Sequence, residues 1–260
     1  MGATRMRLKN RAAVLTGASN GIGAAAARRF AEEGASVVVA DIDEAAGDAV
    51  VSEITSKGGK AIFSKCDVSK REDLEAAFDL CGNHFGRFDI LFNNAAIQDT
   101  RNILDATDED FDNIMNINLR SVFIGIREAA RRMIKHGNGG SIVNTSSTFA
   151  IVGSPGYAAY HATKGAVSSL TRAAGISLME HGIRVNAICP GTIDTPGLRL
   201  GAANTAKDPE AAMQSYLALQ PMKRFGTPEE IANAVLFLAS DEASFVAGEN
   251  FVADGGYTVI

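Results

Sequence analysis

Seven short apolar runs alternate with longer segments of helical periodicity along the whole chain. The runs expected to form strands are Ala13–Leu15, Val37–Val39, Ala61–Phe63, Ile90–Phe92, Ile142–Val143, Val185–Ile188 and Phe251–Val252. This alternation favours a parallel sheet, because consecutive parallel strands need a long crossover connection, which is usually a helix. The runs are apolar throughout, so both faces of the sheet must be covered. The pattern predicts an α/β fold with a doubly wound sheet of about seven parallel strands.

The segments between these strands predict helices and show no break between domains. The expected helices are Gly23–Glu33, Glu44–Lys57, Arg71–Phe85, Asp108–Lys135, Tyr157–Glu180 and Pro228–Leu238. The last has the clearest start, because Thr227 can cap it and Pro228 fits its first turn. No repeat, linker or low-complexity tract interrupts the chain, so residues 1–260 are expected to form a single domain.

Residues 196–225 interrupt the alternation. This stretch is rich in Ala, Gly and polar residues, and we expect only a short helical piece in it, at residues 210–219. A connection of this length inside a compact domain usually has a function. We therefore expect a lid over the substrate, with a plain surface excursion as the alternative.

Composition narrows the classes of function. The chain has 25 basic and 30 acidic residues, and the basic ones are scattered, so no nucleic-acid partner is expected. No run of about eighteen apolar residues could span a membrane, and residues 1–10 lack the apolar core of a secretory signal. A cytoplasmic protein is expected. Cys66, Cys81 and Cys189 are far apart and lack metal-ligand spacing with the four histidines, so buried thiols and no metal are expected.

A glycine-rich turn, Thr16 to Gly23 with the sequence TGASNGIG, joins the first strand to the first helix. In such a loop one glycine permits the tight turn, another lets the backbone approach a pyrophosphate, and the last lets the helix pack on the strand. The free N–H groups and the dipole of the helix N-terminus then face the phosphates. The order of strand, loop and helix predicts a dinucleotide site.

The second strand ends at Asp41, eighteen residues after Gly23, where an adenine ribose is expected. A carboxylate at this place accepts hydrogen bonds from the ribose hydroxyls and repels a 2′-phosphate. No arginine adjoins Asp41 to bind such a phosphate. The sequence therefore predicts NAD over NADP, and the alternative is a solvated aspartate in a turn.

The motifs together resemble the short-chain dehydrogenase/reductase family, whose fold is a Rossmann-type sheet, over essentially the whole chain. The glycine motif Thr-Gly-x-x-x-Gly-x-Gly is matched by Thr16, Gly17, Gly21 and Gly23, and further motifs follow the third, fourth and sixth strands. One departure is Ala96, where the family usually has glycine. The resemblance implies that the cofactor is bound by Gly17, Ser19, Asn20, Gly21, Ile22, Gly23, Asp41, Asp67, Val68, Asn94, Tyr160, Lys164, Pro190, Gly191, Ile193 and Thr195.

Tyr160 and Lys164 form the motif that carries the catalytic prediction. Residues four apart lie on one face of a helix, so the two side chains should meet. A free tyrosine has a pKa of roughly 10. The lysine ammonium and the positive charge of an oxidised nicotinamide would stabilise the phenolate and lower that pKa. The alternative is a surface pair, since this spacing is common.

The resemblance implies two further catalytic residues. Ser147 matches the serine that hydrogen-bonds the substrate oxygen, although the adjacent Ser146 leaves some ambiguity. Asn118 matches the asparagine that holds a water in a proton relay through Lys164, and its alternative reading is a residue that caps or kinks the helix. His161 is not expected to act as the base, because it points roughly a hundred degrees away from Tyr160 on the helix.

These residues imply an NAD-dependent oxidoreductase that interconverts a secondary alcohol and a ketone with Tyr160 as the acid/base. Gln98, Ser147, Phe149 and Tyr160 are expected to contact the substrate, and mostly apolar walls favour a neutral hydrophobic or cyclic compound. One alternative is an NADPH-dependent 3-ketoacyl reductase, against which Asp41 argues. Another is a non-catalytic cofactor-sensing protein, but no catalytic residue is missing. The resemblance and the small residues of Tyr157–Glu180 also predict a homotetramer.

Overall fold

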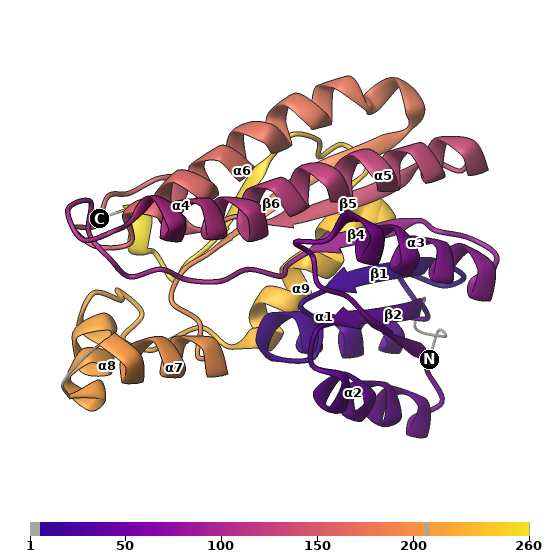
Figure 1. Ribbon diagram of the computed structural model, residues 1–260. Helices are drawn as coiled ribbons and strands as arrows, with labels where there is room; N and C mark the ends of the chain where they lie inside the picture. The colour runs from indigo at the N-terminus through magenta and orange to yellow at the C-terminus, as the bar shows by residue number, and fades with distance from the viewer. Residues whose placement is uncertain (1–5, 206–207, 260) are drawn as a thin grey trace.

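A computed structural model describes residues 6–205 and 208–259, so the ends of the predicted domain and residues 206–207 of the predicted lid lie outside it. Seven parallel strands form one sheet in the order β3-β2-β1-β4-β5-β6-β7 (Figure 1). The strands are β1 (Ala12–Thr16), β2 (Ser36–Asp41), β3 (Lys60–Lys65), β4 (Ile90–Asn93), β5 (Gly140–Thr145), β6 (Ile183–Pro190) and β7 (Asn250–Ala253). The predicted doubly wound Rossmann-type sheet is therefore confirmed.

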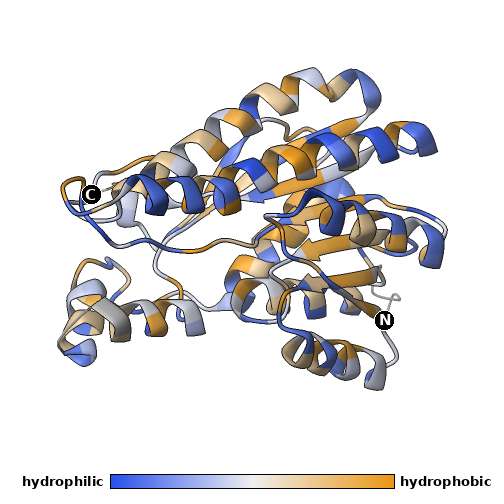
Figure 2. Ribbon diagram, in the orientation of Figure 1, coloured by the Kyte–Doolittle hydropathy of each residue, from blue (hydrophilic) through white to orange (hydrophobic). Residues whose placement is uncertain are grey.

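Helices cover both faces of the sheet. They are α1 (Gly21–Glu32), α2 (Glu44–Ser56), α3 (Arg71–Phe85), α4 (Asp108–Met115), α5 (Ser121–His136), α6 (Ala158–Ser177), α7 (Pro196–Thr205), α8 (Pro209–Ala218) and α9 (Pro228–Ala239). One core cluster joins the sheet to α1, α2 and α9, and the other joins it to α3, α5 and α6. Strands β1, β2 and β4 are accordingly apolar and buried along most of their length (Figure 2). The three cysteines are buried and free.

The predicted helix Asp108–Lys135 is wrong in its continuity. A π-helical segment, Asn116–Arg120, separates α4 from α5. The side chain of Asn118 accepts a hydrogen bond from the amide of Ile97 and donates one to its carbonyl, both at 2.8 Å. This tertiary pairing holds Asn118 against the loop after β4 and accompanies the local widening of the helix.

The segment predicted to be mostly irregular contains two helices, α7 and α8. Helix α7 was missed because Gly197 and Gly201 lower its helix propensity. Its start nevertheless has a signal, since Pro196 occupies the first turn and Thr195 Oγ1 accepts a hydrogen bond from the Leu198 amide at 3.2 Å. Both helices lie beside the edge of the sheet at which the strands end (Figure 1).

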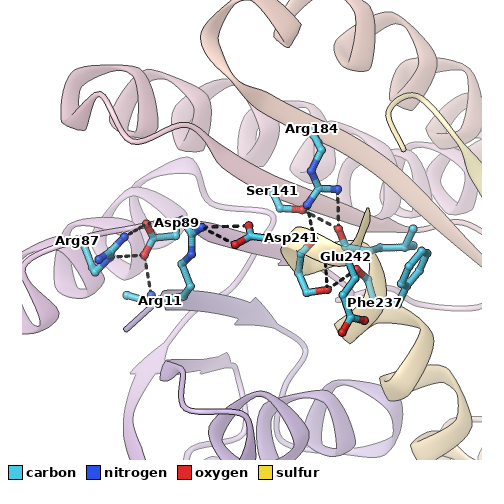
Figure 3. A network of polar contacts seen from close by, with 11 residues as sticks. Arg11, Arg87, Asp89, Ser141, Arg184, Phe237, Asp241 and Glu242 are labelled. Carbon is cyan, nitrogen blue, oxygen red and sulfur yellow. Dashed lines mark hydrogen bonds and ion pairs between the residues drawn. The ribbon is translucent and has the colours of Figure 1, made fainter. Parts of the chain in front are cut away.

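Polar side chains join the elements at the opposite, amino edge of the sheet (Figure 3). Asp89 is buried in front of β4, where it accepts hydrogen bonds from the amide of Ala12 at 2.8 Å and from Arg87 at 2.6 Å. Arg184, at the start of β6, donates to the carbonyls of Leu238 and Ser240 at the end of α9. These contacts tie β1 to β4 and β6 to α9.

Replacing Asp89 with Ala is expected to lower the free energy of unfolding by about 2–4 kcal/mol, because it leaves a buried amide without its acceptor and Arg87 without its partner. Urea denaturation followed by circular dichroism measures the change. Asp241→Ala is the matched control, because Asp241 is an exposed partner of Arg11 and its loss should change stability by no more than about 0.5 kcal/mol. Equal losses in the two variants would contradict the role given to Asp89.

Candidate active site

The predicted site residues lie at the carboxyl edge of the sheet. Strand β1 pairs with β2 on one side and with β4 on the other. From β1 the chain continues to β2 in one direction along the sheet, and from β4 it continues to β5 in the opposite direction. In an open α/β sheet this switch point forms a crevice that binds ligands. The glycine loop follows β1, the Asn94 segment follows β4, and the candidate catalytic residues follow β5.

The glycine loop has the geometry that close approach of a phosphate requires. Gly17 and Gly21 have positive φ values of 60° and 51°, which non-glycine residues rarely adopt. A Cβ added to Gly23 would lie 2.0 Å from the carbonyl oxygen of Gly17, so the helix can pack here only with glycine. The N-cap residue Asn20 makes no side-chain cap, and the first turn of α1 holds no acid. The exposed N–H groups of this turn fit a pyrophosphate.

The segment after β6 lies directly over this loop. A Cβ added to Gly21 would come within 3.3 Å of Thr195 Cγ2. The residues predicted from this segment to bind the cofactor, Pro190, Gly191, Ile193 and Thr195, therefore border the same crevice as Ile22.

Asp41 lies at the end of β2, as predicted, and its carboxylate also has a structural contact that the sequence did not reveal. Its Oδ2 accepts a hydrogen bond from the amide of Ser19 at 2.9 Å, and its Oδ1 accepts one from Asp43 at 3.1 Å. Asp41 thus fastens the glycine loop to β2. No basic side chain is paired with it among the described residues.

Asp67 and Val68 follow β3, and Val68 is buried. Asp67 Oδ1 accepts hydrogen bonds from the hydroxyl of Ser69 at 2.6 Å and from its amide at 3.0 Å. The Ser69 hydroxyl lowers the pKa of this carboxyl group, with smaller contributions from the Ser69 amide and Lys70. Asp67 is therefore held as a carboxylate at the start of α3.

Asn94 joins the ends of β1 and β4. Its Nδ2 donates to the carbonyls of Thr16 and Gly17 at 3.2 and 3.0 Å, and its amide donates to Thr16 Oγ1 at 3.0 Å. Thr145, at the end of β5, donates to Asn94 Oδ1 at 3.3 Å. Thr145 is a supporting residue that sequence reasoning missed, and Thr16 was identified only as a member of the glycine motif. Both stand at strand ends, which is the available signal.

Ser147, Tyr160 and Lys164 come together as predicted. Tyr160 and Lys164 are one turn apart on α6, and Lys164 Nζ lies 5.4 Å from the centre of the tyrosine ring. Ser147 and Tyr160 border the same cavity, and Ser147 Oγ accepts a hydrogen bond from the amide of Phe149 at 3.1 Å. Ser146 is buried, and its hydroxyl donates to the carbonyl of Lys164. Because the Ser146 hydroxyl is engaged in this contact, Ser147 is favoured, and its role stays a prediction.

The pKa values of this cluster show the cost of burial. Burial raises the pKa of Tyr160 to about 12, although the Ser147 hydrogen bond acts in the opposite direction. Burial also lowers the pKa of Lys164 to about 8, and its ammonium donates to the carbonyl of Thr145 at 2.8 Å. Lys164 by itself therefore does not produce the lowered tyrosine pKa that we expected.

Asn118 and His161 lie next to this cluster without contacting the Tyr160 hydroxyl in the described hydrogen bonds. Asn118 is buried, with its amide on the Ile97 backbone and 3.5 Å from Thr163 Oγ1. His161 stacks on the Phe149 ring with centroids 4.5 Å apart, and its Nδ1 lies 2.7 Å from the Phe149 carbonyl oxygen. Both side chains thus position loops around the site.

A cavity of about 240 Å³ opens beside Ser147 and Tyr160. Gln98 and Phe149 line it, as predicted, and Tyr157 and Thr192 contribute to its wall. Further wall residues that the sequence did not indicate include Ser154, Tyr216, Leu219, Gln220 and Tyr257. No charged side chain is among the described residues that line this cavity. A larger cavity of about 630 Å³ lies at the amino edge around Arg11 and Arg184 and contains none of the predicted site residues.

The described part of the chain offers neither a metal cluster nor a membrane span. No group of three or more His, Cys, Asp or Glu residues there could hold a metal ion. None of the helices in residues 6–205 and 208–259 combines the length and apolar character needed to cross a membrane.

Curated relatives match nearly the whole chain. The chain is 40% identical to a cyclopentanol dehydrogenase of Comamonas sp. over 97% of its length and 98% of the relative. It is 40% identical to a 2,5-dichloro-2,5-cyclohexadiene-1,4-diol dehydrogenase of Sphingobium indicum, over 97% and 99%. It is 39% identical to a 3-oxoacyl-[acyl-carrier-protein] reductase of Thermotoga maritima, over 98% and 100%.

A family model and a crystal structure agree with these relatives. The model, described as enoyl-(acyl carrier protein) reductase, matches residues 17–258. A short-chain type dehydrogenase/reductase from Mycobacterium marinum superposes with a TM-score of 0.91 at 35% identity and covers 98% of both chains. The chain is therefore an oxidoreductase that belongs to the short-chain dehydrogenase/reductase family.

Proposed function

We propose that this protein is an NAD-dependent oxidoreductase that interconverts a secondary alcohol and a ketone on a neutral, hydrophobic or cyclic substrate. The observation that supports this most strongly is the position of Ser147, Tyr160 and Lys164. They stand between the glycine loop and a small cavity without charged walls. Two relatives named for the oxidation of cyclic alcohols favour the same substrate class.

In the oxidation direction Ser147 and Tyr160 hold the substrate hydroxyl, and the Tyr160 oxygen accepts its proton. Bound NAD supplies the hydride acceptor and a positive charge. That charge and the Lys164 ammonium stabilise the phenolate against the burial that raises its pKa. Lys164 would hold the nicotinamide ribose of a bound cofactor, and Asn118 would belong to the proton relay that returns Tyr160 to its starting state. Positioning and electrostatics supply the rate enhancement.

Asp41 is the residue on which the choice of NAD depends. The proposed contacts of the cofactor are the glycine-loop residues, Asp41, Asp67, Val68, Asn94 and the segment after β6. A carboxylate at Asp41 repels a 2′-phosphate and accepts hydrogen bonds from ribose hydroxyls. The second candidate function is an NADPH-dependent 3-ketoacyl reductase, which the similarity to the Thermotoga maritima reductase favours.

Helices α7 and α8 form most of the segment that we propose as the lid. Leu198 from α7 and Tyr216 from α8 line the cavity, and Leu219 and Gln220 follow them. Gln220 donates a hydrogen bond to Thr192 Oγ1 at 3.1 Å, so the end of the lid is anchored to the segment after β6. The lid covers the substrate side of the site and excludes water during hydride transfer.

The acid/base role of Tyr160 predicts the effect of removing its hydroxyl. Tyr160→Phe should lower kcat/KM by at least about a hundredfold, because general acid–base catalysis commonly contributes a factor of 10² to 10⁴. NAD affinity should stay within about threefold, because the phenol hydroxyl is a small part of the cofactor contacts. Initial rates at the absorbance band of reduced nicotinamide, with NAD titrated by calorimetry, test both points. Turnover comparable to that of the unmodified enzyme would remove Tyr160 from this role.

The proposed role of Asp41 predicts a change in cofactor preference when its charge is removed. Asp41→Asn should lower the NAD/NADP ratio of kcat/KM by at least about tenfold, because it removes the charge that repels a 2′-phosphate and keeps an acceptor for Ser19. Asp43→Asn is the control, since it removes a nearby charge and can still cap α2. An unmodified enzyme that prefers NADP would support the ketoacyl reductase instead.

We propose that the protein assembles as a homotetramer. Phe123 and Ile134 on α5 and Ile176 on α6 are exposed apolar side chains, and α6 has many alanines that permit close packing. Light scattering at micromolar concentration should therefore give the mass of four chains. A monomeric mass would rule out this assembly. The cytoplasmic location of the protein remains a prediction.

A further inference from the structure

Two tyrosine hydroxyls meet across the substrate cavity. Tyr157 precedes α6, Tyr216 belongs to the lid helix α8, and their hydroxyl oxygens are 3.3 Å apart. Both residues line the cavity that opens beside Tyr160. The pair therefore joins the catalytic helix to the lid at the wall of the substrate site.

The backbone holds Tyr157 in an unusual conformation. Its φ of 62° and ψ of 31° place it in the left-handed region, which non-glycine residues rarely adopt. The amides of Tyr157 and Ala158 donate to the carbonyls of Thr100 and Arg101 at 3.3 and 3.0 Å. The loop after β4 thus contributes to holding the chain in this conformation. Strain of this kind persists where the surrounding structure imposes it, often at functional sites.

The Tyr157 ring lies within a group of aromatic side chains. It packs edge-on against Phe149 with centroids 5.3 Å apart and against Tyr160 with centroids 6.4 Å apart. These contacts fix the ring beside the acid/base, because aromatic pairs favour such edge-to-face geometry. Tyr157, Tyr160 and Tyr216 therefore border the same cavity.

The chemistry of the pair favours a neutral oxygen as its partner. Burial is the largest cause that raises the pKa of Tyr157, and the Tyr216 hydroxyl raises it further, so Tyr157 remains a protonated phenol at neutral pH. One proton bridges the two hydroxyls, which leaves the second proton and several lone pairs for a third oxygen. A hydroxyl or carbonyl group can both donate to and accept from such a pair, as far as its own protons allow.

We propose that the Tyr157–Tyr216 pair binds a second oxygen of the substrate, on the far side of its ring from the carbon that is oxidised. The inference rests on the proposed function and deepens it, since it restricts the substrate class to cyclic diols and hydroxyketones. The reacting hydroxyl lies at Ser147 and Tyr160, and the remote oxygen takes the free proton of the tyrosine pair. A relative named as a cyclohexadiene-1,4-diol dehydrogenase accepts two oxygens in this relation.

The test compares cyclohexanol with cis- and trans-1,4-cyclohexanediol, with NAD, in the unmodified enzyme and in Tyr157→Phe and Tyr216→Phe. The readout is the ratio of kcat/KM for the better diol to that for cyclohexanol. A hydrogen bond of about 1 kcal/mol predicts a ratio of about fivefold, after allowance for the two equivalent hydroxyls of the diol. Either variant should bring the ratio to within about twofold of one. Tyr257→Phe is the matched control, because it removes another hydroxyl from the cavity wall and should keep the ratio.

The other outcomes separate the two proposals. If both classes of alcohol are oxidised but the diol has no advantage, or the advantage survives both variants, the pair does not bind a second oxygen. An equal loss for diol and cyclohexanol in the variants would also overturn the inference, because it would show that the pair only holds the lid. No turnover of any of the three alcohols in the unmodified enzyme would overturn the proposed substrate class, and this inference with it.

Discussion

The junction between the ends of β1 and β4 is the constraint on which the candidate site depends. At this junction Asn94 donates to the carbonyls of Thr16 and Gly17, and Thr16 Oγ1 accepts from the backbone after β4. A Cβ on Gly17 would lie 2.8 Å from Ala95 Cα, so the two turns touch with no room for a side chain between them. The N-terminus of α1 is thereby fixed beside β4, and the crevice keeps one shape.

This arrangement brings Tyr160 and Lys164 together in surroundings that disfavour the charged form of each side chain. The burial that seats Lys164 beneath Tyr160 disfavours both the ammonium and the phenolate, since it moves the two pKa values toward about 8 and about 12. A charged group placed in the crevice acts strongly in such surroundings, because the effective dielectric is low. An oxidised cofactor would supply such a charge, so in the proposed mechanism Tyr160 would become a competent base only when the cofactor is bound. Catalysis is then coupled to cofactor binding by electrostatics.

Much of the fold could be predicted because its signals are local. Apolar runs mark the strands, and Thr227 with Pro228 marks the start of α9, where the structure shows the capping hydrogen bonds. The positions of Ser147, Tyr160 and Lys164 together follow from one helical turn and one strand end. The sequence offered a kink at Asn118 only as an alternative, because the cause of the π-helical segment is a pairing with Ile97, twenty-one residues away. Periodicity carries no information about contacts of that range.

The substrate wall shows the same limit more sharply. Tyr157 is the first residue of the predicted helix Tyr157–Glu180, but α6 begins at Ala158. Nothing in the sequence indicates the left-handed backbone of Tyr157, which the carbonyl of Thr100 contributes to holding. Tyr216 lies in the segment with the weakest pattern, and it meets Tyr157 only because α8 folds back over the carboxyl edge. The cofactor half of the site is built from strand ends and one glycine loop, whereas the substrate half is built from segments that no core constrains. A change in α8 can therefore alter which substrate is bound without disturbing the junction of β1 and β4. This is the physical reason why the reaction class is easier to infer here than the substrate.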